Sequence, residues 1–208
     1  MKIGITMRID EFNSISENRV SLDINWICFF ETFGYQYQLI PYSKIIRPEY
    51  LDNIDIVIFS GGNDLSEYNN NFVNRIRDES EFQLLDLCIK SKKKVLGICR
   101  GMQLINFYFS GRQKKIDGHL KQNHLIISEA KWLTDIKVVN SFHNWGIPFD
   151  YLSDSLNAMA FSKDQNYVEA LEHKSLLIRG VMWHPERNTF EKLSNENYFR
   201  SQQKILEF

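Results

Sequence analysis

The segment GICRGMQ, residues 97–103, places Cys99 between two glycines, after one apolar run and before another. A nucleophile at a strand-to-helix turn has a strained backbone, and neighbours without a Cβ atom relieve the crowding around it. A helix that begins after Cys99 would direct its unpaired N–H groups and positive pole at the sulfur and favour the thiolate. The pattern predicts a nucleophilic cysteine, the alternative being a cysteine packed in a glycine-rich turn.

A cysteine nucleophile needs a base and a group that orients the base, and the segment VMWHPER, residues 181–187, supplies candidates for both. Pro185 favours an extended conformation for the residue before it, and in an extended segment residues two apart point to the same side. His184 and Glu186 can therefore converge on one space. His184 is the best candidate base among the five histidines, the alternative being a histidine satisfied at a strand end.

The segment FSGGND, residues 59–64, follows a buried apolar run and precedes the cysteine segment by one predicted strand. Its two glycines allow backbone N–H groups to turn outward, as an oxyanion requires while a tetrahedral intermediate forms. Ligands bind at the carboxyl ends of the strands in open α/β sheets. We therefore predict that the N–H groups of Gly62 and Arg100 form the two halves of an oxyanion hole.

Short apolar runs alternate with segments of helical period, which is typical of a parallel sheet covered by helices on both faces. The predicted strands lie at residues 2–6, 35–41, 55–62 and 93–99, and the predicted helices at 22–33, 77–90 and 102–109. The second half offers candidate strands at 124–128, 136–142, 158–162, 167–172 and 175–183, and a C-terminal helix at 194–208. We predict an α/β fold with a doubly wound, mostly parallel, flavodoxin-like sheet in a single domain of residues 1–208.

Composition limits the partners and the location. The formal net charge of −1 provides no long-range field for nucleic acid or an anionic membrane, so we expect neither as a partner. No apolar run has the length of a signal peptide or a membrane span, which predicts a cytoplasmic protein. The three cysteines are widely spaced and form no CxxC pair, which argues against disulfides and a zinc site. We expect Cys28 and Cys88 to fill the core as small hydrophobes.

These segments together resemble the class I glutamine amidotransferase-like superfamily, and within it the stand-alone γ-glutamyl hydrolase branch of peptidase C26 type. GICRGMQ is similar to the G-x-C-x-G-x-Q elbow of the superfamily, and WHPE is similar to its second signature. The similarity covers about residues 2–187. It implies a doubly wound α/β sheet in which Cys99, His184 and Glu186 are nucleophile, base and orienting residue.

The resemblance also implies how a γ-glutamyl group is held. Gln103 would bind its α-amino end. Ser141, Phe142 and His143, in the segment VNSFH, would line the glutamyl pocket together with Gly61 beside the oxyanion loop.

The sequence differs from the usual pattern of the branch at two places, and both are expected to lie near the leaving group of the substrate. The branch usually reads S-x-H-H-Q where residues 141–145 read SFHNW, and it has Gln where this chain has Met182. They leave the acceptor end of the substrate open, and Trp145 either stacks on a flat group such as a nucleobase or simply packs. The short chain, rich in Lys, Asn and Ile, is similar to the branch members that remove glutamate from γ-glutamyl cytidine diphosphoramidate in capsule modification.

The implied activity is hydrolysis of a γ-glutamyl amide through a thioester on Cys99, with a small-molecule substrate and no metal or organic cofactor. An alternative substrate is a γ-glutamyl amine or a γ-glutamyl peptide, from which the amine or peptide would be the leaving group. One alternative is a glutaminase subunit that supplies ammonia to a separate synthase partner, and another is a γ-glutamyl-binding module without catalysis. Apolar residues of the C-terminal helix would either support a homodimer or pack on their own domain.

Overall fold

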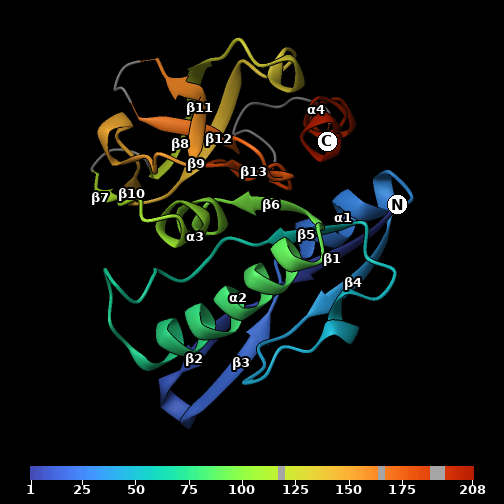
Figure 1. Ribbon diagram of the computed structural model, residues 1–208, viewed down its shortest axis with the longest axis vertical. Helices are drawn as coiled ribbons and strands as arrows, with labels where there is room; N and C mark the ends of the chain where they lie inside the picture. The colour runs from blue at the N-terminus through green and yellow to red at the C-terminus, as the bar shows by residue number, and fades with distance from the viewer. Residues whose placement is uncertain (117–119, 164–166, 188–194) are drawn as a thin grey trace.

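A computed structural model describes residues 1–116, 120–163, 167–187 and 195–208 of the chain. In these residues a nine-stranded sheet runs in the order β4-β1-β5-β6-β13-β12-β11-β8-β9 (Figure 1). Its parallel part consists of β4 (Gln36–Ile40), β1 (Lys2–Thr6), β5 (Ile56–Phe59), β6 (Lys94–Ile98) and β13 (Ile178–Val181). The α/β fold and its central parallel sheet confirm the sequence prediction.

The second half of the chain extends this sheet with antiparallel strands. They are β12 (Val168–His173), β11 (Leu156–Ser162), β8 (Leu120–Ile127) and β9 (Val138–Phe142). Two small sheets accompany them, one of β2 (Arg8–Phe12) with β3 (Glu17–Ser21) and one of β7 (Lys114–Lys115) with β10 (Trp145–Gly146). Strands β2 and β3 were not predicted from the sequence.

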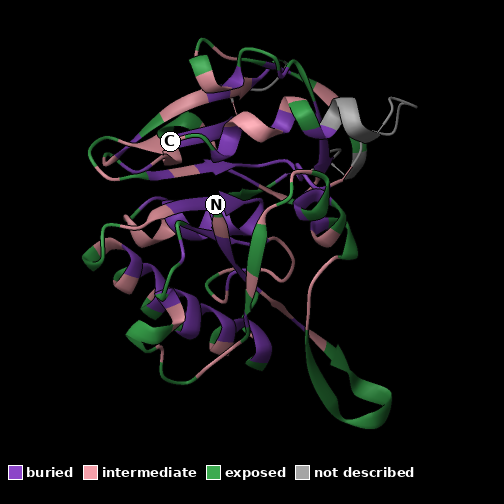
Figure 2. Cartoon of the chain, turned by 90° about the vertical axis from the view of Figure 1, so that its right-hand side faces the viewer, coloured by how far each residue is buried: buried purple, intermediate pink, exposed green. Residues whose placement is uncertain are grey.

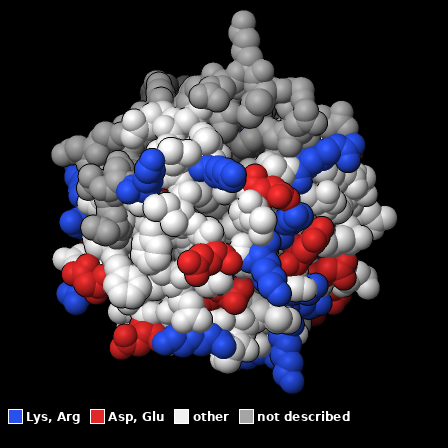
Figure 3. All heavy atoms as spheres, turned by 90° about the horizontal axis from the view of Figure 1, so that it is seen from above, with Lys and Arg blue, Asp and Glu red and all other residues white. Residues whose placement is uncertain are grey.

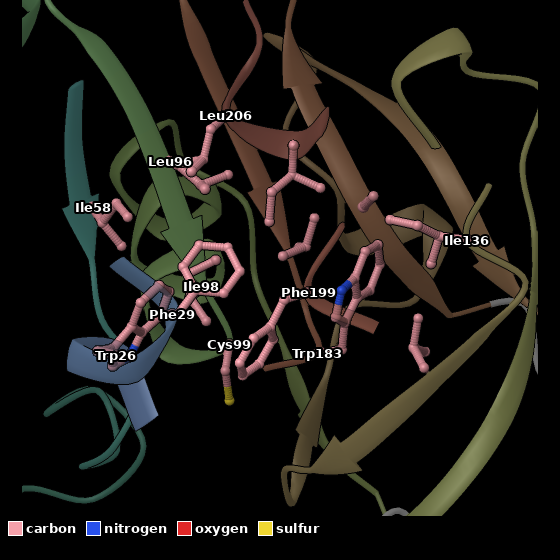
Figure 4. Packing of buried hydrophobic residues seen from close by; sticks show 14 of the residues in the cluster. Trp26, Phe29, Ile58, Leu96, Ile98, Cys99, Ile136, Trp183, Phe199 and Leu206 are labelled. Carbon is pink, nitrogen blue, oxygen red and sulfur yellow. The ribbon is translucent and has the colours of Figure 1, made fainter. Parts of the chain in front are cut away.

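Helices cover both faces of the sheet, because consecutive side chains of a strand point to opposite faces and the central strands are apolar on both. Ile56 and Ile58 of β5 pack in a core with α1 (Ile24–Thr32) and α4 (Asn195–Gln203), whereas Val57 and Phe59 pack on the opposite face with α2 (Phe72–Lys90) and α3 (Arg100–Tyr108) (Figures 1 and 4). Helix α2 begins five residues before the predicted start because Asn71, whose side chain accepts from the N–H of Asn74, caps it.

Two expectations about individual side chains have different outcomes. Cys88 is fully buried, but Cys28 is exposed, so the prediction that Cys28 fills the core was wrong. Helix α1 buries Trp26, Phe29 and Phe30 on one face, which leaves Cys28 on the opposite face. Phe199 of α4 packs edge-on against Phe29 with 5.4 Å between ring centroids, so this part of the C-terminal helix packs on its own chain.

The β2–β3 hairpin stands out from the body of the molecule as an exposed ribbon (Figure 2). On the face that Figure 3 shows, Lys or Arg side chains are interspersed with Asp or Glu side chains. In the described part of the chain, no helix combines the length and apolar character needed to cross a membrane.

Candidate active site

Cys99 occupies the joint between β6 and α3 in a strained conformation. Its φ is +51° and its ψ is −106°, outside the regions that residues with a side chain normally adopt. The flanking glycines make this joint possible, because a Cβ at Gly101 would lie 2.0 Å from the carbonyl oxygen of Phe59 and one at Gly97 would lie 2.6 Å from that of Gly101. Figure 4 shows the sulfur directed away from the packed side chains at the end of the strand.

Backbone hydrogen bonds fix Cys99 from both sides. Its N–H donates to the carbonyl of Val181 on β13 at 2.8 Å, and its carbonyl accepts from the N–H of Gln103 at 3.1 Å. Arg100 is the first residue of α3, so its N–H has no acceptor within the helix. The turn therefore leaves a backbone donor beside the sulfur.

His184 and Glu186 converge as the extended segment predicts. Nδ1 of His184 lies 2.7 Å from Oε1 of Glu186, and both residues are buried. The side chain of His184 also forms a hydrogen bond with Cys99. Burial alone would lower the pKa of His184, but Glu186 and Cys99 outweigh it and raise this pKa to about 9. The imidazole is thus poised to carry a proton beside the sulfur.

Asn140 on β9 holds the segment that carries this histidine. Its Nδ2 donates to the carbonyls of His184 and Arg187 at 2.8 and 2.7 Å, and its Oδ1 accepts from the N–H of His184 at 2.9 Å. Asn140 was not among the predicted site residues, although its neighbours Ser141 and Phe142 were.

The glycine loop lies directly against the histidine and the cysteine. A Cβ at Gly61 would lie 2.6 Å from Cε1 of His184 and 3.5 Å from Cβ of Cys99. Gly62 has a φ of +92°, and the side chain of Arg8 lies across it. Only residues without a side chain fit this loop.

A buried ionic network lies behind the loop. Arg77 of α2 donates through Nε to Glu81 at 3.0 Å, and the Arg100 side chain pairs with both Glu81 and Asp78. Burial lowers the pKa of Arg77 to about 10. Burial alone would raise the pKa of Glu81, but the charges of Arg100 and Arg77 outweigh it and hold that pKa below its usual value. The network joins α2 to the first residue after Cys99.

A cavity of about 700 Å³ opens over Cys99 and His184, and Gln103, Phe142 and His143 line it. Nε2 of Gln103 donates to the carbonyl of Trp145 at 3.1 Å and contacts the sulfur of Met182 at 3.6 Å. The ring of Phe142 stands edge-on to that of His184, with centroids 5.7 Å apart.

Other predicted substrate residues lie around this cavity in different ways. Nδ1 of His143 lies 2.9 Å from the carbonyl of Trp145. Ser141 is fully buried in β9 opposite Gln122 and is not part of the cavity wall. Gly61 lines a second cavity, of about 270 Å³. Trp145 lines the first cavity while its ring packs on Tyr68 at 4.9 Å, so it both packs and faces the open space.

The sequence profile of peptidase C26 matches residues 3–186. The chain belongs to the peptidase C26 family. The gamma-glutamyl-CDP-amidate hydrolase of Campylobacter jejuni is 36% identical over 189 residues, which are 90% of this chain and 90% of that protein. The putative glutamine amidotransferase-like protein YvdE of Lactococcus lactis is 29% identical over 202 residues, covering 84% of this chain and 83% of that one.

The fold of this C26 chain has solved counterparts. The crystal structure of a putative GMP synthase subunit from Thermoplasma acidophilum has a TM-score of 0.70 at 18% identity, and the match covers 100% of this chain and 98% of that chain. The class I glutamine amidotransferase fold expected from the sequence is thereby confirmed, and the family matches place the chain among glutamine amidotransferase-like hydrolases. Among the described residues, no group of three or more His, Cys, Asp or Glu side chains is arranged to hold a metal ion.

Proposed function

We propose that this C26 hydrolase cleaves a γ-glutamyl amide bond and releases glutamate. The observation that carries the proposal is the convergence of Cys99, His184 and Glu186, in which Nδ1 of the histidine is 2.7 Å from the carboxylate and its ring hydrogen-bonds the cysteine. This arrangement has the parts of a nucleophile, a base and an orienting acid.

In the proposed first step, the Cys99 thiolate attacks the γ-carbonyl carbon. The N–H groups of Gly62 and Arg100 stabilise the oxyanion. The role of Gly62 is supported by the closeness of the glycine loop to Cys99, and that of Arg100 by its place as the first residue of α3, where its N–H has no acceptor within the helix. His184 then protonates the departing nitrogen as the tetrahedral intermediate collapses to a thioester. The leaving group departs as a neutral amine or amide.

In the second step, His184 removes a proton from water, which attacks the thioester and releases glutamate and the thiolate. Glu186 keeps the proton-bearing Nδ1 in place and stabilises the imidazolium. Gln103, Phe142 and His143 line the cavity over Cys99 and are proposed to hold the γ-glutamyl group, whereas the buried Ser141 would support β9. The chemistry uses only this chain's own groups, because the electrophile is an ordinary amide.

The proposed substrate is γ-glutamyl-CDP-amidate, which would yield glutamate and cytidine diphosphoramidate. Its support is the 36% identity over 90% of the chain to the hydrolase named for that substrate. Trp145 lines the cavity and is one of the residues that differ from the branch pattern, which makes it a candidate for stacking on the base.

The proposal is tested by measuring glutamate release from four substrates: γ-glutamyl-CDP-amidate, a γ-glutamyl amine, a γ-glutamyl dipeptide and glutamine. Wild-type protein should release glutamate fastest from the first, and Cys99→Ala should abolish release while leaving the melting temperature close to that of wild type. Equal turnover by Cys99→Ala would refute the mechanism. Slow release from glutamine alone, which rises when a synthase is added, would favour a glutaminase subunit.

A further inference from the structure

Two arginines that the proposed chemistry does not use stand beside His184. Arg8 and Arg187 line both the cavity of about 700 Å³ and the neighbouring cavity of about 270 Å³, and His184 lines both as well. The side chain of Arg8 is 41% exposed and that of Arg187 is 26% exposed, so solvent and ligands reach both. The two cavities therefore meet where two guanidinium groups flank the proposed proton donor.

Arg8 is fixed at this place by the base of the β2–β3 hairpin. The side chain of Asn63 forms two hydrogen bonds with the backbone of the neighbouring Ile9: it donates to the carbonyl at 2.8 Å and accepts from the N–H at 3.1 Å. Asp10 accepts from Nε of Arg8 at 2.7 Å. The side chain of Arg8 passes over Gly62, where a Cβ would lie 3.1 Å from its Cδ. The guanidinium group is thus held next to the proposed oxyanion hole.

Arg187 is fixed by the segment that follows the same hairpin. Its Nε donates at 2.9 Å to Asp23, the residue that caps α1, and its guanidinium lies over the ring of Phe142 at 4.8 Å. Its Nε is also 3.6 Å from Glu186. One continuous segment of the chain, residues 8–23, therefore supplies a carboxylate anchor to each arginine.

Both anchors use the Nε group, and this leaves the outer ends of the two guanidinium groups for a ligand. Within the described residues, neither terminal nitrogen of Arg8 or of Arg187 forms a hydrogen bond. A guanidinium presents its N–H donors in a planar fork that matches the oxygens of phosphate groups. Because Asp10 and Asp23 offset part of the positive charge, recognition here rests on directed donors rather than on a net field.

We propose that Arg8 and Arg187 form a subsite for a diphosphate group in the leaving part of the substrate. This inference rests on the proposed function, since His184 must lie beside the departing nitrogen, and whatever is bonded to that nitrogen then meets the two arginines. A diphosphate carries oxygens on two neighbouring phosphorus atoms, so it can engage both forks at once. The hairpin acts as the positioning element for this subsite.

The test is direct binding of inorganic pyrophosphate and of cytidine diphosphate, measured by calorimetry on the full-length protein. Both should bind wild type, and Arg8→Gln and Arg187→Gln should each weaken binding roughly 10- to 100-fold, the range for losing charge-assisted hydrogen bonds. Arg8→Lys, which keeps the charge but not the fork, should give an intermediate loss. Arg19→Gln is the matched control, because Arg19 lies on β3 of the same hairpin and lines neither cavity.

No binding to wild type, or equal binding by Arg8→Gln and wild type, would overturn the subsite. Because this measurement needs no turnover, it separates the two proposals. If wild type binds diphosphate but releases glutamate from no γ-glutamyl compound, the subsite stands and the proposed function fails. If wild type hydrolyses a neutral γ-glutamyl anilide but binds no diphosphate, the subsite alone fails.

A kinetic comparison then ties the subsite to the leaving group. Arg8→Gln should lower kcat/KM for the diphosphate substrate roughly 10- to 100-fold more than for a neutral γ-glutamyl anilide. Arg8 is the informative position here, because Arg187 also lies near Glu186. An equal loss on both substrates would count against leaving-group recognition by Arg8.

Discussion

The guanidinium group of Arg77 donates a 3.1 Å hydrogen bond to the carbonyl oxygen of Gly61. The same group donates to the carbonyl of Ser60 at 2.9 Å and to Oδ1 of Asn63 at 2.9 Å. A buried side chain of α2 thus holds three of the four residues 60–63, in the loop that faces Cys99. Asn63 in turn hydrogen-bonds the backbone of Ile9 in the hairpin. Arg77 therefore links the glycine loop and the proposed diphosphate subsite to helix α2.

Replacing Arg77 should separate loop positioning from stability. Arg77→Met leaves Glu81 with one buried partner fewer and should cost about 3–5 kcal/mol of unfolding free energy. Arg77→Lys keeps a charge but loses the fork, so it should lower kcat by more than it changes KM. Urea unfolding and steady-state kinetics measure the two effects. Arg75→Met, on the exposed side of the same helix, is the control, and unchanged kcat in Arg77→Lys would contradict the positioning role.

Adding one methyl group at Gly61 should disable the site. The new Cβ would lie 2.6 Å from Cε1 of His184, so the imidazole must move from its place beside Cys99. A displacement of about 1 Å can cost roughly 100-fold in rate, and we expect a loss of at least that size for Gly61→Ala. Gly34→Ala provides the comparison, since it has a φ of +63° but no atom within 4 Å. It should lower the melting temperature while kcat stays within about twofold of wild type.

The pH profile should report the raised pKa of His184. With that pKa at about 9, the imidazolium persists to mildly alkaline pH, and kcat/KM should decline as pH rises through about 9. In Glu186→Gln, the carboxylate no longer offsets the effect of burial on the pKa of His184, so this pKa should fall. The alkaline limb should therefore move to lower pH, and kcat should fall. Rates measured from about pH 5 to 10 test this shift. Glu79→Gln, an exposed position on α2, should keep the wild-type profile.

The same pKa has a consequence for stability. Because it lies above the ordinary value of 6.5, the interactions of the His184 imidazolium stabilise the folded state fully below about pH 6.5. That contribution should be lost as pH rises through about 9. Unfolding free energies at several pH values should therefore decline less over this range in Glu186→Gln than in wild type. Parallel declines in the two proteins would contradict the ion pair.

The sequence predicted the central sheet because its strands are short, continuous apolar runs bounded by turn residues. β1 begins and ends at the predicted residues, and the boundaries of the other parallel strands shift by only a few. The β2–β3 hairpin escaped prediction because RIDEF and ENRVS carry charged residues in both strands and lie outside the core. No Asn-Gly or Asp-Gly pair marks their turn, which runs through a 3₁₀ helix instead.

The sequence also brought out the residues of the proposed chemistry, because the elbow and the WHPE segment are local patterns. Arg8, Asn140 and Arg187 were missed for the opposite reason. Each gains its place through contacts with residues far away in the chain, as when Arg187 meets Asp23. Cys28 was misplaced because its apolar neighbours in NWICFF suggest burial on every side, although a helix on a sheet buries one face only.

Thiol reactivity should distinguish Cys99 from the other two cysteines. Burial raises the pKa of Cys88 to about 12, so this thiol should stay unmodified at neutral pH. Cys28 is exposed and should also be labelled, so the reaction of Cys99 is best followed in Cys28→Ser protein. There, iodoacetamide should label Cys99 at least about tenfold faster than it labels Cys28 in the Cys99→Ala protein, because His184 contacts the sulfur and can accept its proton. His184→Ala should remove this advantage, and a rate that is the same with and without His184 would show that the histidine does not activate the sulfur.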